Sequence, residues 1–171
     1  LLIAIPTTAG TGSETTLAAV ITDANTRHKY AINDFPLIPA YAVLDPKVTV
    51  SLPPSLTATT GMDALTHAVE AYIGGSTTKS TRKNALRATK LIFENIYKAY
   101  DNGTDIEARK NMLKASFYAG CAFTKSYVGL TITPSKTKAK KGETITLTLE
   151  LQSGYKLKKL FLNDSTNGLT K

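Results

Sequence analysis

The chain has 171 residues, which is enough to bury a core and suits one domain, or a domain with a small module. Its 42% hydrophobic and 20% charged residues exclude an intrinsically disordered chain, and no apolar run approaches the about 20 residues of a membrane-spanning helix. The formal net charge of +8 is uneven: residues 1–126 hold 13 Lys/Arg and 10 Asp/Glu, whereas residues 127–171 hold eight Lys and three acids.

The N-terminal part alternates apolar runs with turns and prolines. The opening LLIAIP has no basic leader, so it indicates a buried strand rather than a signal peptide. The glycine-containing loop TTAGTGSE follows, then the β-branched segment TLAAVITD and the polar turn ANTRHK. Prolines divide the next residues into short extended pieces, of which AYAVLD is predicted as a buried strand.

Three helices are predicted between residues 60 and 123. Two prolines precede the first, from about Thr60 to Tyr72, and the glycines of IGGSTTKS end it. TRKNALRATKLIFENIYKAY has the apolar spacing of an amphipathic helix, and the turn DNGTD caps a third helix, IEARKNMLKASFYAGCAF. That helix contains the single cysteine, Cys121, which excludes an intrachain disulfide and is expected to be a buried, inert thiol.

After Gly129 the apolar pattern changes to period two. Isoleucine and leucine alternate with threonine and glutamate in ETITLTLEL, which predicts a half-buried strand, and LKKLFLN is predicted as another. The excess lysines of this tail could contact anionic surfaces, but no aromatic residues are interleaved with them as in a nucleic-acid site. We therefore expect a solvated basic face, with no nucleic-acid partner and no membrane partner.

The loop TTAGTGSE at residues 7–14 is the first candidate site. Glycines after a strand let backbone N–H groups approach a phosphate closely. The loop matches neither the P-loop nor the G-x-G-x-x-G pattern, so a plain turn remains the alternative.

Asp63 and His67 are the second candidate. Positions four apart lie on one face of a helix, so a carboxylate and an imidazole there could chelate one Fe, Zn or Ni ion. The alternative is a surface or outer hydrogen bond, because two ligands do not close a catalytic metal site. The other histidine, His28, lies in a polar turn and is expected to be exposed.

Three segments, taken in order, resemble the iron-dependent alcohol dehydrogenase family: IPTTAGTGSETT with AVITD, LDPKVTVSLPPSLTATTGMDALTHAVEAY, and ARKNMLKASFYAGCAFTKSYVG. The resemblance covers about residues 1–129, and TGMDALTHAVEAY is highly specific to that family. It implies an α/β plus α fold. Residues 1–55 would be the C-terminal part of an NAD(P)-binding α/β domain, and residues 56–129 part of an all-helical metal-binding domain, before a small β-strand tail at 130–171.

The same resemblance implies hydride transfer between a small alcohol or aldehyde and NAD or NADP in the cytoplasm. A divalent metal, iron or alternatively zinc, would polarise the substrate oxygen. Asp63 and His67 look like the first two of four metal ligands. The residues at positions that resemble the family's cofactor contacts are Thr7, Thr8, Ala9, Gly10, Thr11, Lys29 and Thr49.

The sequence departs from the family in ways that bear on activity. The family's glycine- and serine-rich phosphate loop, upstream of the opening strand, is absent, and no histidine follows His67 to supply the remaining ligands. We therefore expect an impaired or inactive enzyme. A sheet without its leading strands would expose edges and apolar faces, which predicts pairing with another chain, such as a homo-oligomer, or low stability.

The tail has a resemblance of its own. TITPSKTKAKKGETITLTLELQSGYKLKKLFLND is similar to the internalin-type repeat modules of bacterial surface proteins. Such modules are small, all-β spacers or adhesion elements. The alternative function is therefore a non-enzymatic surface or adhesion-type spacer that works through this tail.

Overall fold

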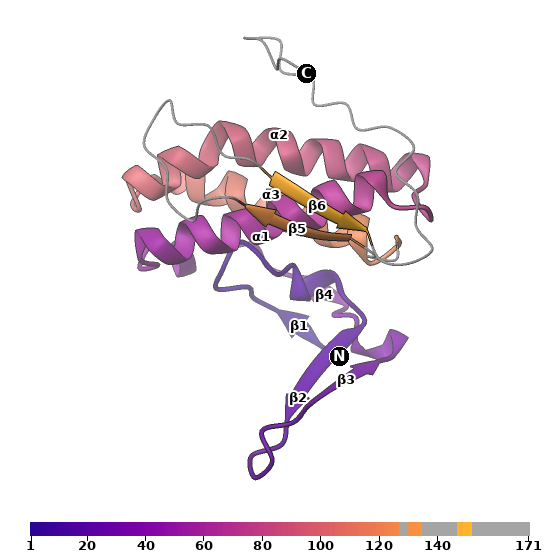
Figure 1. The fold of residues 1–171 in the computed structure, drawn as a ribbon. Helices are drawn as coiled ribbons and strands as arrows, with labels where there is room; N and C mark the ends of the chain where they lie inside the picture. The colour runs from indigo at the N-terminus through magenta and orange to yellow at the C-terminus, as the bar shows by residue number, and fades with distance from the viewer. Residues whose placement is uncertain (127–129, 135–146, 152–171) are drawn as a thin grey trace. The chain divides into compact units, whose positions relative to one another are not determined.

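The computed structural model describes residues 1–126, 130–134 and 147–151 (Figure 1). The chain divides into two compact units, Leu1–Val128 and Gly129–Lys171. The first unit holds an α/β segment followed by three helices, so the predicted fold class is confirmed. In the part of the chain that is described, no helix combines the length and apolar character needed to cross a bilayer.

In the described residues of the second unit, two strands pair antiparallel. Strand β5 (Leu130–Pro134) pairs with β6 (Leu147–Leu151). Strand β6 lies within the stretch ETITLTLEL, which confirms a strand there. The strand predicted for LKKLFLN lies outside the described residues.

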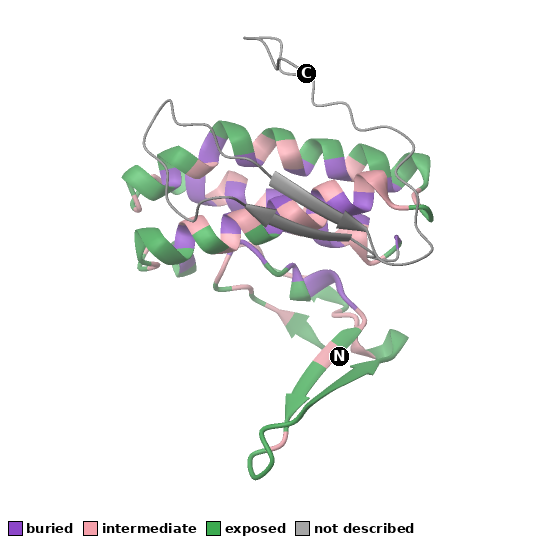
Figure 2. Cartoon of the chain, viewed as in Figure 1, coloured by how far each residue is buried: buried purple, intermediate pink, exposed green. Residues whose placement is uncertain are grey.

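The first unit begins with two short strand pairs. Strand β1 (Ile3–Ala4) runs parallel to β4 (Tyr41–Ala42), and both lie within runs predicted as buried strands. The predicted burial was wrong, because Ile3 and Tyr41 are exposed and Ala4 and Ala42 are half-buried. Strands β2 (Ala18–Thr22) and β3 (Lys29–Asn33) form an antiparallel hairpin. The hairpin projects away from the helices and is exposed along most of its length (Figure 2).

Single turns of 3-10 helix connect these strands to each other and to the helices. They are η1 (Ser13–Thr15), η2 (Phe35–Leu37) and η3 (Pro46–Thr49). The side chain of Asp45 caps η3 by accepting a 2.9 Å hydrogen bond from the backbone N–H of Lys47.

Helix α1 (Pro54–Ile73) begins six residues before the predicted start at Thr60. The prediction was wrong because it took the two prolines as stop signals. Pro54 occupies the first helical position, where a missing N–H removes no intrahelical hydrogen bond and the fixed φ suits a helix.

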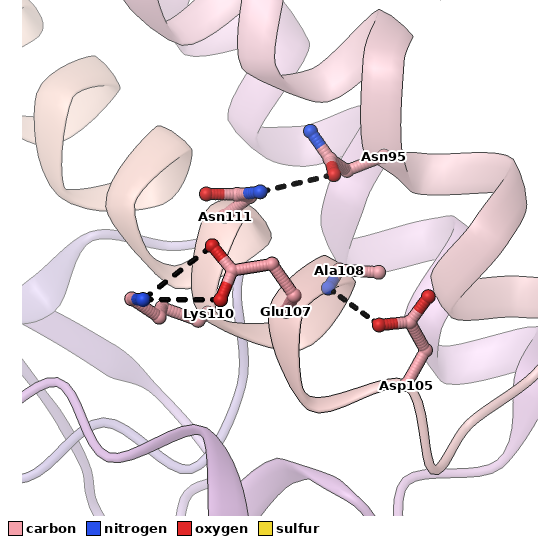
Figure 3. A network of polar contacts seen from close by, with 6 residues as sticks. All are labelled: Asn95, Asp105, Glu107, Ala108, Lys110 and Asn111. Carbon is pink, nitrogen blue, oxygen red and sulfur yellow. Dashed lines mark hydrogen bonds and ion pairs between the residues drawn. The ribbon is translucent and has the colours of Figure 1, made fainter.

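The other two helices begin at side-chain caps. Helix α2 (Lys79–Asp101) starts with a capping box in which Thr78 and Thr81 exchange hydrogen bonds. Helix α3 (Ile106–Phe123) has the predicted bounds, and Asp105 accepts a 2.9 Å hydrogen bond from the backbone N–H of Ala108 (Figure 3).

The three helices pack on one another through faces rich in alanine. Short side chains allow helix axes to approach closely, so larger residues are needed only where space remains. Met112 and Leu113 of α3 and Ile92 of α2 fill that space. The buried alanines are Ala64, Ala68, Ala71, Ala85, Ala88, Ala99, Ala108, Ala115, Ala119 and Ala122.

A polar contact also joins α2 to α3. The Asn111 side-chain amide donates a 3.2 Å hydrogen bond to Oδ1 of Asn95, as Figure 3 shows. Asn95 is buried, and its own amide donates to the carbonyl of Leu91 at 2.8 Å. Because a buried amide is costly without partners, this pair fixes how the two helices face each other.

Candidate metal and nucleotide site

Asp63 and His67 come together one turn apart on α1. The Nε2 atom of His67 lies 3.6 Å from Oδ1 of Asp63, and the two side chains are 19% and 46% exposed, respectively. Protein ligands each lie about 2.0–2.2 Å from a zinc ion, so two atoms at this separation can share one ion. The donors, a carboxylate oxygen and an imidazole nitrogen, suit iron or zinc.

The environment of His67 favours the neutral imidazole that a metal requires. Burial lowers the pKa of His67, and the nearby Asp63 carboxylate opposes this shift. Nδ1 is buried and has no hydrogen-bond partner within the described residues, and the ring stacks on Phe123. The residues present therefore fit a metal as far as two ligands allow.

Glu70 is a second carboxyl on the face of α1 that carries Asp63 and His67. It is buried, and burial, followed by the negative charge of Asp63, raises the pKa of Glu70 to about 7. This residue was not identified from the sequence, although positions 63, 67 and 70 share a helical face. Among the residues described, no group of three His, Cys, Asp or Glu side chains is placed to hold a metal ion.

The loop at residues 7–11 packs against the start of the same helical face. Ala9 and Gly10 are buried, Thr8 is half-buried, and Thr7 and Thr11 are exposed. A Cβ on Gly10 would lie 2.6 Å from the carbonyl oxygen of Thr60. Thr60 lies three residues before Asp63, so the structure brings the loop and the Asp63–His67 pair to one side of α1.

The end of this loop is fixed to α3. Gly12 has a φ of 63°, and a Cβ there would lie 3.0 Å from the Cα of Gly120. The hydroxyl of Thr15 donates to the carbonyl of Gly12 at 2.7 Å, and that of Thr124 donates to the carbonyl of Thr15 at 3.2 Å. These contacts explain the glycine at position 12, where the left-handed conformation and the close approach of α3 both disfavour a side chain.

Glu14 is a second buried carboxyl that was not identified from the sequence. It is 4% exposed, its Oε1 has no hydrogen-bond partner within the described part of the chain, and burial raises its pKa. Cys121 was predicted to be a buried thiol, but it is half-buried. Burial raises the pKa of its thiol, and the nearby Lys125 opposes this shift.

The two remaining cofactor candidates lie on other elements. Lys29 is exposed at the start of β3, and Thr49 is buried at the end of η3. The hydroxyl of Thr49 donates to the carbonyl of Pro46 at 2.8 Å, within its own turn. His28 is exposed on the hairpin, as predicted, with its ring 4.5 Å from that of Tyr30.

Arg109 anchors the segment between η3 and α1. Its buried guanidinium donates to the carbonyl of Leu52 at 3.2 Å, to Oγ1 of Thr57 at 2.6 Å, and to the carbonyl of Gly103 at 2.8 Å. It thereby ties the start of α3 to the start of α1, on which the Asp63–His67 pair is carried.

Two protein-family models match most of the first unit, Leu1–Val128. Residues 1–46 match the model described as iron-containing alcohol dehydrogenase, and residues 57–133 match the C-terminal model of the Fe-containing alcohol dehydrogenase family. The NAD-dependent methanol dehydrogenase of Bacillus methanolicus is 49% identical over 129 residues, which are 75% of this chain and 34% of that protein.

Solved structures of similar proteins share the fold. One is the sulfoacetaldehyde reductase of Bifidobacterium kashiwanohense in complex with NAD+, with a TM-score of 0.71 and 39% identity over 74% of this chain and 34% of that one. Another is the alcohol dehydrogenase of Oenococcus oeni, with a TM-score of 0.71 and 41% identity over 75% of this chain and 33% of that one. The chain spans about a third of the length of these relatives.

Proposed function

Because this chain belongs to the iron-containing alcohol dehydrogenase family, whose models match residues 1–46 and 57–133, we propose that it carries part of the machinery of an NAD(P)-dependent alcohol dehydrogenase. The reaction is hydride transfer between a small alcohol or aldehyde and the nicotinamide of NAD or NADP. The observation that carries this proposal is the 3.6 Å approach of His67 Nε2 to Asp63 Oδ1 beside the loop at residues 7–11.

We assign metal binding to Asp63 and His67. When bound there, a divalent ion, iron or alternatively zinc, would act as a Lewis acid toward the oxygen of the alcohol or aldehyde. His67 offers a neutral nitrogen because burial lowers its pKa, and Asp63 offers a negatively charged oxygen that is partly open to solvent. The two side chains thus offer two donor atoms to an ion on a partly exposed face of α1.

We assign nucleotide binding to the turn formed by Thr7, Thr8, Ala9, Gly10 and Thr11. Its buried glycine and alanine pack on α1, while the exposed hydroxyls of Thr7 and Thr11 remain available to a ligand. Lys29 and Thr49 are proposed as further cofactor contacts, on the resemblance to the family alone. In this structure Thr49 is buried, and its hydroxyl donates to the carbonyl of Pro46.

Turnover by this chain alone is proposed to be low. Catalytic metals usually have three or more protein ligands, and the described residues bring only two together. The one other histidine in the sequence, His28, is exposed on the hairpin. We also propose that the chain associates into a homo-oligomer in the cytoplasm.

Calorimetric titration with Zn²⁺ or, without oxygen, Fe²⁺ tests the metal assignment, and NAD(P)H-linked assays with short alcohols and aldehydes test the activity. We expect measurable metal binding that His67→Gln removes and the matched control His28→Gln preserves. Robust NAD(P)H-linked turnover would refute the proposed impairment of activity. Equal metal affinity of His67→Gln and His28→Gln would refute the assignment of metal binding to Asp63 and His67.

The second proposal is a spacer or adhesion function for residues 130–171. What supports it is that Gly129–Lys171 forms a compact unit of its own, with β5 and β6 paired antiparallel. Cell fractionation tests it: this function requires the protein at the cell surface, and its confinement to the cytosol would remove the proposal.

A further inference from the structure

The imidazole of His67 is stacked on the ring of Phe123, the last residue of α3. The ring centroids are 4.7 Å apart and the planes differ by 24°. Helices α1 and α3 approach here through alanines, with Ala68 beside Ala119 in one cluster and Ala71 beside Ala122 in the next. These short side chains let the two helices come close enough for the rings to meet face to face.

The two ring nitrogens of His67 have different surroundings. Nε2 lies 3.6 Å from Oδ1 of Asp63, whereas Nδ1 is buried without a hydrogen-bond partner in the described part of the chain. A histidine that binds a metal usually has its ring orientation fixed by a hydrogen bond from its other nitrogen. The described residues make no such bond to His67.

We propose that Phe123 is a positioning residue for His67, whose ring it holds in the plane in which Nε2 can face Asp63. Rotation of the imidazole by about a quarter turn around its Cβ–Cγ bond would break the near-parallel contact with Phe123, whereas a half-turn would keep it. The stack therefore fixes the plane of the ring, and in that plane Nε2 lies 3.6 Å from Oδ1 of Asp63. The metal part of this inference rests on the proposed function, whereas the orientation of the ring does not require a metal.

The flat face of Phe123, rather than its volume alone, carries this role. Phe123 is half-buried and packs beside the small cluster of Ala71, Ala85 and Ala122, outside the main core. Leucine at position 123 would fill similar apolar space but present no ring, whereas tyrosine would keep the ring. Comparing these two substitutions separates positioning from simple packing.

The experiment uses the full chain after metal removal with a chelator. Nuclear magnetic resonance relaxation of the imidazole C–H bonds reports the rigidity of each ring, and the exposed His28 serves as an internal reference because the sequence has two histidines. Calorimetric titration with Zn²⁺ then measures metal affinity. The variants are Phe123→Leu, Phe123→Tyr and, as a matched control on the same helix, Phe117→Leu.

In the unsubstituted chain we expect the His67 ring to be far more rigid than that of His28. Phe123→Leu should mobilise the His67 ring and weaken Zn²⁺ binding about tenfold, the effect typical of losing a group that orients a metal ligand. Phe123→Tyr and Phe117→Leu should preserve both properties.

Two results would overturn the inference: a His67 ring as mobile as that of His28 in the unsubstituted chain, or an unchanged His67 ring in Phe123→Leu. The first result decides the matter even where Phe123→Leu does not fold. Failure of the unsubstituted chain to bind Zn²⁺ would instead refute the proposed metal role, and the ring measurement would still decide the role of Phe123.

Discussion

Gly10 lies directly against Thr60, with room for no side chain between the loop at residues 7–11 and α1. A Cβ on the glycine would come within 2.6 Å of the Thr60 carbonyl oxygen and 2.7 Å of its Cβ. Because part of this obstacle is helical backbone, which cannot rotate away as a side chain can, the loop and the helix must move apart to admit a methyl group.

The first prediction follows from that contact. Gly10→Ala should lower the free energy of unfolding by about 1–3 kcal/mol, the usual cost of overpacking a well-filled site. The matched control is Gly75→Ala, because Gly75 is exposed and an added Cβ would have no atom within 4 Å. Urea denaturation followed by circular dichroism measures both. Equal stability of the two variants would contradict the close packing of the loop on α1.

Arg109 provides a second prediction. Its guanidinium is buried and makes hydrogen bonds to Leu52, Thr57 and Gly103, so Arg109→Ala leaves one buried hydroxyl and two half-buried carbonyls without their donor. We expect a loss of about 2–3 kcal/mol in the free energy of unfolding. Arg87→Ala is the control: Arg87 is exposed, its guanidinium lies over the Tyr118 ring at 5.3 Å, and such a contact contributes about 0.5–1 kcal/mol. If Arg109→Ala lowers the free energy of unfolding less than Arg87→Ala does, the anchoring role of Arg109 is refuted.

Glu70 should make stability depend on pH. Its pKa is raised to about 7 in the folded protein, so the folded state holds a proton that the unfolded chain releases near the ordinary glutamate pKa of 4.5. The stabilising contribution is therefore complete below about pH 4.5 and is lost as the pH rises through 7. A tenfold change in proton affinity corresponds to about 1.4 kcal/mol, so the shift from 4.5 to about 7 corresponds to roughly 3 kcal/mol.

Glu70→Gln cannot ionise, so we expect it to flatten the fall in stability between pH 5 and pH 8. Chemical denaturation across that pH range in the presence of a chelator measures the effect. Glu94→Gln is the control, because Glu94 is exposed and makes only a 3.8 Å surface ion pair with Lys90. If Glu70→Gln keeps the full pH dependence of the unsubstituted chain, the raised pKa is contradicted.

The exposed hairpin predicts self-association. Val20 is 64%, Ile21 53%, Tyr30 53% and Ile32 45% exposed, although a two-stranded hairpin alone in water is marginally stable. Ile32→Lys should lower the average mass seen by analytical ultracentrifugation, whereas Thr22→Lys, which adds the same charge at an exposed polar position of the hairpin, should change it little. An unsubstituted chain that sediments as a stable monomer would count against association.

Local sequence signals were sufficient to predict the helices and the pairing of Asp63 with His67. The capping turn with Asp105 marked the start of α3, and the four-residue spacing placed Asp63 and His67 on one face of α1. Pro54 misled the prediction of the start of α1, because proline at the first helical position and proline before a helix look alike in sequence.

Contacts between distant segments could not be read from local patterns. The stacking of Phe123 on His67, the burial of Glu14 and the hydrogen bonds of Arg109 to Leu52 and Thr57 all join elements that are far apart along the chain. Glu70 is the exception, since its position on the face of Asp63 and His67 could have been identified from helical spacing. Its raised pKa could not, because that depends on burial by neighbouring helices.

A crystal of the chain grown with Zn²⁺ and measured at the zinc absorption edge tests most directly whether Asp63 and His67 bind one ion together. Our account predicts one anomalous peak on α1, about 2.0–2.2 Å from both Oδ1 of Asp63 and Nε2 of His67. Zinc bound only elsewhere on the protein, for instance at the exposed ring of His28, with nothing between Asp63 and His67, would contradict it.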